Sequence, residues 1–201
     1  MKSRQSGLTM VEMIATMVVA AVLLVMAQFG LMAVASTRTI AEANRLIMDI
    51  NYTRSEAIKW GEVAGMCIAD SIDFCVGNSP ARGGCRCKSG AAAKTYHDGW
   101  LIFIDLDRDG RYDSDTEELL RVGLPPSPGI EMVSNNAIQM GLSLNATGAF
   151  LDGTEEGKVY VCFEGESTPD APGRIVVLHV SGRTEIKEIA PGESCRPQPV
   201  Q

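Results

Sequence analysis

The sequence predicts an α+β protein in which one long N-terminal helix precedes a head built mainly of β-strands. From residue 8 to about residue 60, apolar side chains form first a continuous run and then a helical pattern, and no proline occurs before Pro80. Beyond Gly61, short apolar runs alternate with turn residues, which is typical of strands.

Composition narrows the protein class before any motif is considered. The 201 residues fit one domain, or one domain plus an appendage, and the charged fraction of 21% is too ordinary for a disordered chain. The net charge of −7 argues against a surface devoted to nucleic acid. Only one stretch approaches the length that a bilayer needs, which excludes a multi-span membrane protein.

The N-terminal segment consists of a basic, polar part, residues 1–7, and an almost wholly apolar part, residues 8–35. A helix of this apolar part would be roughly 40 Å long, enough to cross a bilayer with tilt. Lys2 and Arg4 favour a cytoplasmic N-terminus. A secretory signal peptide cut after Ala35 and a plain membrane anchor are two interpretations of this pattern. Both leave Glu12 unexplained, because a carboxylate in hydrocarbon costs several kcal/mol without a partner.

A third interpretation accounts for Glu12. Cleavage after Gly7 would free the amine of Leu8, and one subunit's Glu12 would pair in the membrane with a neighbour's new amine. Residues 7–13, Gly-Leu-Thr-Met-Val-Glu-Met, resemble the prepilin cleavage motif of type IV pilins and type II secretion pseudopilins. The resemblance implies that a prepilin peptidase cuts after Gly7 and methylates the amine of Leu8, which stands where the family usually has Phe.

The helix is expected to continue over residues 36–61 as an amphipathic segment and to end near Gly61. Its apolar residues recur mostly at helical spacing and are Ile40, Ala43, Ile47, Ile50, Ala57 and Ile58. The charged residues that fall largely between them are Arg38, Glu42, Arg45, Asp49, Arg54, Glu56 and Lys59. One apolar stripe would therefore face the head.

The head is expected over residues 62–190, followed by an extended, proline-containing tail at 191–201. The predicted strands are 65–69, 100–106, 119–122, 130–134, 138–144, 158–163, 174–180 and 184–189. Turn signals such as Asp109-Gly110 and Ser181-Gly182 separate them.

The head carries a second resemblance, to minor pilins of the FimT/FimU/GspH type. The segments that carry it are 99–110, 119–122, 144–150, 159–163 and 174–183. Together with the leader, it runs from Gly7 to about Lys187. It implies a long helix packed on a head of two antiparallel sheets. The segment 76–96 matches nothing in that pattern and is interpreted as an insertion.

Six cysteines in an exported head indicate disulfides. Pairing of Cys162 with Cys195 would tie the tail to a late strand and close a loop of about 30 residues, which contributes about 3 kcal/mol. The other four allow three connectivities and are Cys67, Cys75, Cys85 and Cys87. A zinc site made of these four is the competing interpretation, although paired C-x-x-C spacings are absent from the sequence.

The acidic segment 105–113 resembles the start of a calcium loop. Positions 1, 3, 5 and 9 are filled by Asp105, Asp107, Asp109 and Asp113. Gly110 at position 6 permits the tight turn, but position 12 is Thr116, and Glu117 and Glu118 come late. The favoured interpretation is an acidic turn between two strands, with a weak calcium site as the alternative. No other cofactor is expected.

Nucleic-acid binding and catalysis are both disfavoured. Some FimT-type pilins bind DNA through a basic motif near the C-terminal end, and the matching stretch here, 182–188, holds only Arg183 and Lys187 between glutamates. The two histidines are His97 in a loop and His179 in an apolar strand, and the sequence has no G-x-S-x-G, H-E-x-x-H or P-loop motif.

The resemblance implies a structural subunit, a minor pilin or pseudopilin that helps to initiate or cap a type IV pilus or a type II secretion pseudopilus. It would sit in the bacterial inner membrane with its head in the periplasm. Its partners would be other pilins, reached through the N-terminal helix, the prepilin peptidase and the inner-membrane assembly platform. The alternatives are a DNA-binding minor pilin and a secreted β-domain released after Ala35.

Overall fold

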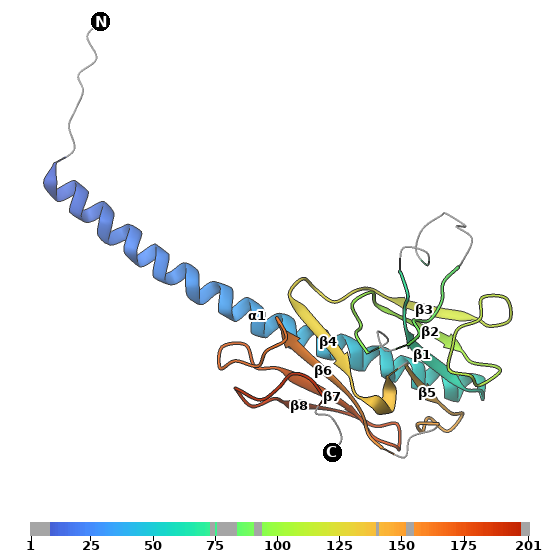
Figure 1. Ribbon diagram of the computed structural model, residues 1–201. Helices are drawn as coiled ribbons and strands as arrows, with labels where there is room; N and C mark the ends of the chain where they lie inside the picture. The colour runs from blue at the N-terminus through green and yellow to red at the C-terminus, as the bar shows by residue number, and fades with distance from the viewer. Residues whose placement is uncertain are drawn as a thin grey trace, which may run out of the picture.

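The computed structural model describes residues 9–72, 75, 84–90, 94–139, 141–151 and 155–197, without the side chains of 26–33. One helix, α1 (Met10–Trp60), comprises 51 residues and is therefore about 75 Å long. Its first half projects from the head, and its second half lies within it (Figure 1). The helix ends where Gly61 adopts a left-handed conformation, with φ of 69°, and donates its N–H to the Ala57 carbonyl.

The head contains two four-stranded antiparallel sheets, which confirms the predicted fold class. The first sheet has the order β3 (Leu119–Gly123), β2 (Trp100–Ile104), β1 (Ala64–Ile68) and β5 (Gly141–Leu144). The second has the order β4 (Ile130–Ser134), β6 (Gly157–Phe163), β7 (Arg174–Leu178) and β8 (Thr184–Glu188). Each sheet therefore has two edge strands, and the chain passes between the sheets after β3, β4 and β5.

The second half of α1 lies between the two sheets and completes their shared core (Figure 1). Its buried apolar residues in this core are Ala43, Leu46, Ile50 and Ala57. They pack in one cluster with residues of both sheets, such as Ile102 in β2 and Val176 in β7. Since both sheets close on it, the helix buries more than the single stripe that the sequence pattern indicated.

Three acids of α1 spaced seven residues apart are buried, although the sequence pattern placed them among the charged residues between the apolar positions. Glu42, Asp49 and Glu56 are 6%, 1% and 9% exposed, whereas Ile40 and Ile58 are 39% and 51% exposed. Each acid has a partner, which is the condition for burying a charge. The spacing of seven places them on one face of the helix.

Asp49 joins the helix to the first sheet. Its Oδ2 accepts a hydrogen bond of 2.8 Å from Nε1 of Trp100, and its Oδ1 lies 3.0 Å from the Arg121 guanidinium. The guanidinium of Arg45 covers the Trp100 ring at 4.7 Å from its centroid. A Cβ on Gly123 would lie 2.1 Å from Trp100 Nε1, so only glycine leaves room for this indole. The Trp100 indole is thus fixed by its hydrogen bond to Asp49, by the Arg45 guanidinium over its ring and by the close approach of Gly123.

The predicted strand 138–144 is wrong in its first part. A short 3₁₀ helix, η1 (Asn136–Ile138), precedes β5, which begins only at Gly141. The Asn135 side chain donates to the Glu156 carbonyl and accepts from the Lys158 N–H, and this fixes the turn that starts η1. Ile138 packs into the core from η1 and not from a strand, which accounts for an apolar residue at this position. The other predicted strands overlap those observed.

The outer face of the first sheet is covered by the segment that follows β1. Outward residues of the sheet, including Cys67, Leu101 and Phe103, form a second cluster with Cys75 and other residues around it. Disulfides join Cys67 to Cys87 and Cys75 to Cys85. All four are therefore in disulfides, and none of them is a thiolate that could bind zinc. This cover explains why β1 and β2 are buried on both faces.

The C-terminal segment covers the outer face of the second sheet. A disulfide joins Cys162 in β6 to Cys195, and both cluster with Ile189. The chain turns before it reaches this bond, because Glu193 donates its N–H to the Ala190 carbonyl and Gly192 donates to Ser167. Each sheet is thus covered on its outer face by a disulfide-tied segment.

Replacing Asp49 by Ala should lower the free energy of unfolding by about 2 kcal/mol, since a hydrogen bond to a charged group contributes about 1.5–3 kcal/mol. Asp49→Asn keeps an oxygen for Trp100 and should cost less. Urea unfolding of the full chain in detergent micelles, followed by tryptophan fluorescence, measures both. Asp170→Ala, at an exposed aspartate, is the control. The role of Asp49 is refuted if Asp49→Ala costs no more than this control.

Replacing Cys162 and Cys195 together by Ala should lower the free energy of unfolding by about 3–4 kcal/mol, since their bond spans 33 residues. The matched pair Cys75→Ala with Cys85→Ala opens a loop of only 10 residues and should cost about 1 kcal/mol less. Thermal and urea unfolding under non-reducing conditions give the order. A larger loss from the shorter loop would contradict this account.

Candidate functional site

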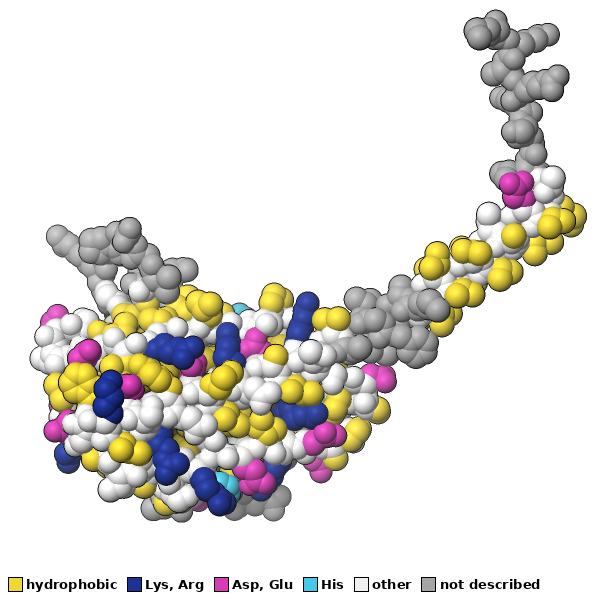
Figure 2. Space-filling model, turned by 180° about the vertical axis from the view of Figure 1, so that it is seen from behind, with side chains coloured by type: hydrophobic (Ala, Val, Ile, Leu, Met, Phe, Trp, Pro, Cys, Tyr) yellow, Lys and Arg dark blue, Asp and Glu magenta, His cyan; other side chains and the backbone are white. Residues whose placement is uncertain are grey.

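The described part of α1 outside the head, residues 10–25, is exposed throughout. Figure 2 shows hydrophobic side chains along this arm. The large apolar ones are 50–82% exposed and are Met10, Val11, Met13, Ile14, Met17, Val18, Val19, Val22, Leu23, Leu24 and Val25. Each such side chain gains about 1.5–3 kcal/mol when it is fully buried. A continuous apolar surface of this kind marks a membrane or protein contact.

No helix in the described part of the chain is long and apolar enough to cross a membrane. The predicted span 8–35 also contains Leu8 and the side chains of 26–33, which lie outside the described part.

Glu12 lies in the first turn of α1. Thr9 is the N-cap, with extended φ and ψ of −77° and 155°, and its side chain accepts a hydrogen bond of 3.4 Å from the Glu12 N–H. The sequence Thr-x-x-Glu thus matches a capping box, and the carboxylate lies near the positive pole of the helix. Its side chain is exposed to solvent. Gly7 and Leu8 lie outside the described residues, so cleavage between them stays a prediction.

The loop between β2 and β3 brings together three of the four predicted calcium ligands. One carboxylate oxygen from each of Asp105, Asp107 and Asp109 lies within 4.8 Å of the others, whereas Asp113 is outside this group. Asp105 is fully buried, and Asp107 and Asp109 are exposed. Burial raises the pKa of the Asp105 carboxyl, and the charges of Asp109 and Asp107 raise it further, against the N–H groups of Gly110 and Arg108.

Glu117 closes this loop, a role that the sequence did not assign to it. Its two carboxylate oxygens accept hydrogen bonds of 2.9 Å from the backbone N–H groups of Leu106 and Asp113. It is only 8% exposed, and burial raises the pKa of its carboxyl. The sequence signal that could have indicated this role is an acid just before the predicted strand 119–122, in a loop rich in aspartate.

The two cations proposed for DNA binding do not form a basic surface. Arg183 is exposed on the turn before β8, and the Lys187 ammonium lies 3.6 Å from Glu185. Glu185 also lies 3.2 Å from His179 Nε2, while Glu156 lies 2.8 Å from His179 Nδ1. Carboxylates therefore lie beside Lys187 and His179 at this edge of the second sheet, which disfavours phosphate binding.

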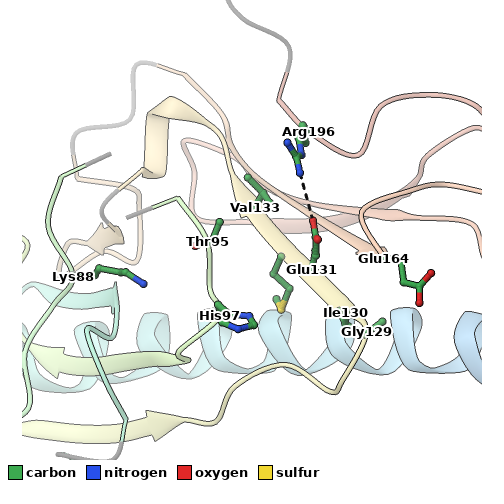
Figure 3. Close-up of a pocket in the computed structure, with 10 residues that line it drawn as sticks. Lys88, Thr95, His97, Gly129, Ile130, Glu131, Val133, Glu164 and Arg196 are labelled. Carbon is green, nitrogen blue, oxygen red and sulfur yellow. Dashed lines mark ion pairs between the residues drawn. The ribbon is translucent and has the colours of Figure 1, made fainter. Parts of the chain in front are cut away.

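A pocket of about 650 Å³ lies between β4 and the segment that carries Lys88, Thr95 and His97 (Figure 3). Glu131 at its wall faces the Arg196 guanidinium at 4.0 Å. The Lys88 ammonium is held by Asp98 at 2.7 Å. These charges are balanced by one another, and we assign no chemistry to the pocket.

Comparison with known families gives two matches. The model of type II transport protein GspH matches residues 42–182, and the model of the prokaryotic N-terminal methylation motif matches residues 2–28. Together the two matches cover most of the chain and leave out residues 29–41 and the C-terminal part after residue 182. No curated protein matches the chain.

Solved structures of the type IV minor pilin FimU of Pseudomonas aeruginosa (strain PAO1) are similar to this chain. One crystal form matches with a TM-score of 0.55 and 18% identity over 79% of this chain and 96% of that one. Another matches with a TM-score of 0.51 and 19% identity over 77% and 98%. At this identity the likeness concerns the fold, a long helix with two antiparallel sheets.

Replacing Glu117 by Ala should speed hydrogen exchange at the Leu106 and Asp113 amides by about 10- to 100-fold. Loss of a charged acceptor corresponds to about 1.5–3 kcal/mol of local stability. Exchange followed by mass spectrometry of the full chain, in calcium-free buffer, measures this. The exposed neighbour Glu118→Ala should leave both amides unchanged. Equal exchange in the two variants would show that Glu117 does not close the loop.

Proposed function

The chain belongs to the family of type II transport protein GspH, and from this premise we propose that it helps to initiate or cap a fibre of pilin-like subunits. Proteins of the GspH/FimU type are minor pilins or pseudopilins, structural subunits of a type IV pilus or a type II secretion pseudopilus. The observation that carries the proposal is the apolar arm of α1 with a carboxylate in its first turn.

The arm supports assembly because one rigid helix joins it to the head. The second half of α1 is fixed between the two sheets, so whatever buries residues 10–25 also fixes where the head lies. Before assembly the arm would be buried in lipid, and in the fibre it would be buried by arms of neighbouring subunits. This role needs no cofactor, since apolar packing and one ion pair hold the subunit.

Glu12 would set the register between neighbouring arms. After cleavage, the amine of Leu8 stands immediately before the N-cap Thr9, where it adds its charge to the positive end of the helix. A neighbour's Glu12 carboxylate would pair with this amine in surroundings that exclude water. An unpaired charge at the centre of a bilayer costs about 2.5–3.5 kcal/mol on insertion scales, so the pair favours one relative position of two helices.

The proposed topology and partners follow from the same segment. Lys2 and Arg4 keep the N-terminus in the cytoplasm, the apolar part passes once through the bacterial inner membrane, and the head lies in the periplasm. The prepilin peptidase would cut after Gly7 and methylate Leu8. Other pilins or pseudopilins and the inner-membrane assembly platform would then bind the processed subunit.

The alternatives have less support. A secreted β-domain would be released after Ala35, but α1 continues through this residue, which is buried and accepts a hydrogen bond of 3.1 Å from Thr39 Oγ1. A DNA-binding minor pilin would need clustered cations, whereas Lys187 lies beside a glutamate and the chain carries a net charge of −7.

Glu12→Ala should leave cleavage after Gly7 largely intact but reduce incorporation into sheared fibres at least ten-fold, the factor that about 1.4 kcal/mol gives. The reason is that the variant cannot neutralise a neighbour's amine. Mass spectrometry of the mature N-terminus, with a test for methylation, and immunoblots of the fibre fraction give both readouts.

The matched control is Glu62→Ala, which removes an exposed glutamate just beyond α1 and should assemble normally. Normal incorporation of Glu12→Ala would refute the role of the carboxylate. A mature chain that begins at Ser36, or that keeps residues 1–7, would refute the proposed function as a whole.

A further inference from the structure

Asp105 presents a buried oxygen that has no partner. The side chain is 0% exposed, and its Oδ2 accepts a hydrogen bond of 3.1 Å from the Gly110 N–H and lies 3.5 Å from Ser143 Oγ. Its Oδ1 is buried and accepts no hydrogen bond. Native proteins rarely leave a buried polar atom unpartnered, and a water molecule or a bound ion would supply the partner that this oxygen lacks.

Asp105 belongs to a group of three carboxylates. Asp105, Asp107 and Asp109 each bring one oxygen within 4.8 Å of the other two. Asp107 Oδ1 accepts the Asp109 N–H at 3.2 Å, and Asp109 Oδ1 accepts the Arg111 N–H at 2.7 Å. These bonds hold the two exposed carboxylates in place and leave each of them a second oxygen.

The loop's own cations do not neutralise this group. Arg108 and Arg111 flank the three acids, yet in the part of the chain that the structure describes no ion pair joins either of them to a carboxylate. Arg108 adopts a left-handed conformation, with φ of 63°, and Gly110 follows with φ of 73°. The backbone therefore turns tightly around the acids, and their like charges stay close together.

We propose that Asp105, Asp107 and Asp109 bind a calcium ion within the loop between β2 and β3. All three donors are carboxylate oxygens, which suit calcium, whereas structural zinc sites are built from cysteine sulfur and histidine nitrogen. Magnesium demands a near-ideal octahedron, whereas calcium accepts the irregular set that two exposed side chains and water provide. This site is independent of the role in the fibre.

Glu117 shapes the site without serving as a ligand in this structure. Both of its oxygens are taken by the N–H groups of Leu106 and Asp113, which leaves water to complete the coordination. A calcium site with three carboxylates and several waters is expected in the weak class, with Kd of about 10⁻⁴–10⁻³ M. That affinity suits a head outside the cytoplasm, where calcium reaches such concentrations.

Calorimetric titration of the full chain in detergent micelles with calcium chloride, up to about 10 mM, tests the proposal. The expected result is a saturable heat with Kd of about 10⁻⁴–10⁻³ M, a raised thermal midpoint, and affinity for magnesium chloride at least ten-fold weaker. The absence of a saturable heat from calcium would overturn the proposal, and equal magnesium affinity would overturn the choice of metal.

The double variant Asp107→Asn with Asp109→Asn tests where the ion binds, because it keeps the size of both side chains and removes two charges. It should fold, because both residues are exposed, and should lose calcium affinity at least ten-fold. Asp115→Asn, at an exposed acid of the same loop outside the group, should bind as the unchanged chain does. Retained binding in the first variant, or equal loss in the second, would place the ion elsewhere and refute the site.

Discussion

The first half of α1 exposes apolar side chains that the described remainder of the chain does not cover, and the rest of the structure depends on this constraint. A helix that is apolar around its circumference is stable only when other apolar groups surround it. The head cannot fold back over the arm, because one uninterrupted helix holds the two apart. The arm therefore exposes an apolar surface that only contacts outside the described chain could bury.

The other half of the same helix is fixed by polar contacts as well as by apolar packing. Buried apolar residues would tolerate some sliding along the helix axis, but Asp49 meets Trp100 and Arg121 at only one register. Glu42 adds a second such contact, since it accepts hydrogen bonds of 3.0 and 2.6 Å from the N–H and the hydroxyl of Ser127. These contacts relate the position of the head to that of the arm.

Disulfide-tied segments cover the outer faces of the two sheets. Cys67 and Cys87 belong to the cluster over the first sheet, and Cys162 and Cys195 belong to the cluster over the second. Both covers are small clusters, which gain little from apolar burial alone. A covalent bond limits the unfolded states of each segment and so supports a cover that its own contacts would hold only weakly.

The sequence by itself determined the long helix, most strands and the anomaly of Glu12, because each is a local pattern of spacing or of one charge among apolar residues. Tertiary structure alone decided that Asp49 is buried, since its partner Trp100 lies 51 residues away. It also decided that Ile138 enters the core from a 3₁₀ turn and that Cys67 pairs with Cys87. The spacing of residues along a chain shows the period of a helix or a strand. The burial of a residue and the pairing of cysteines depend instead on which distant segments fold against one another.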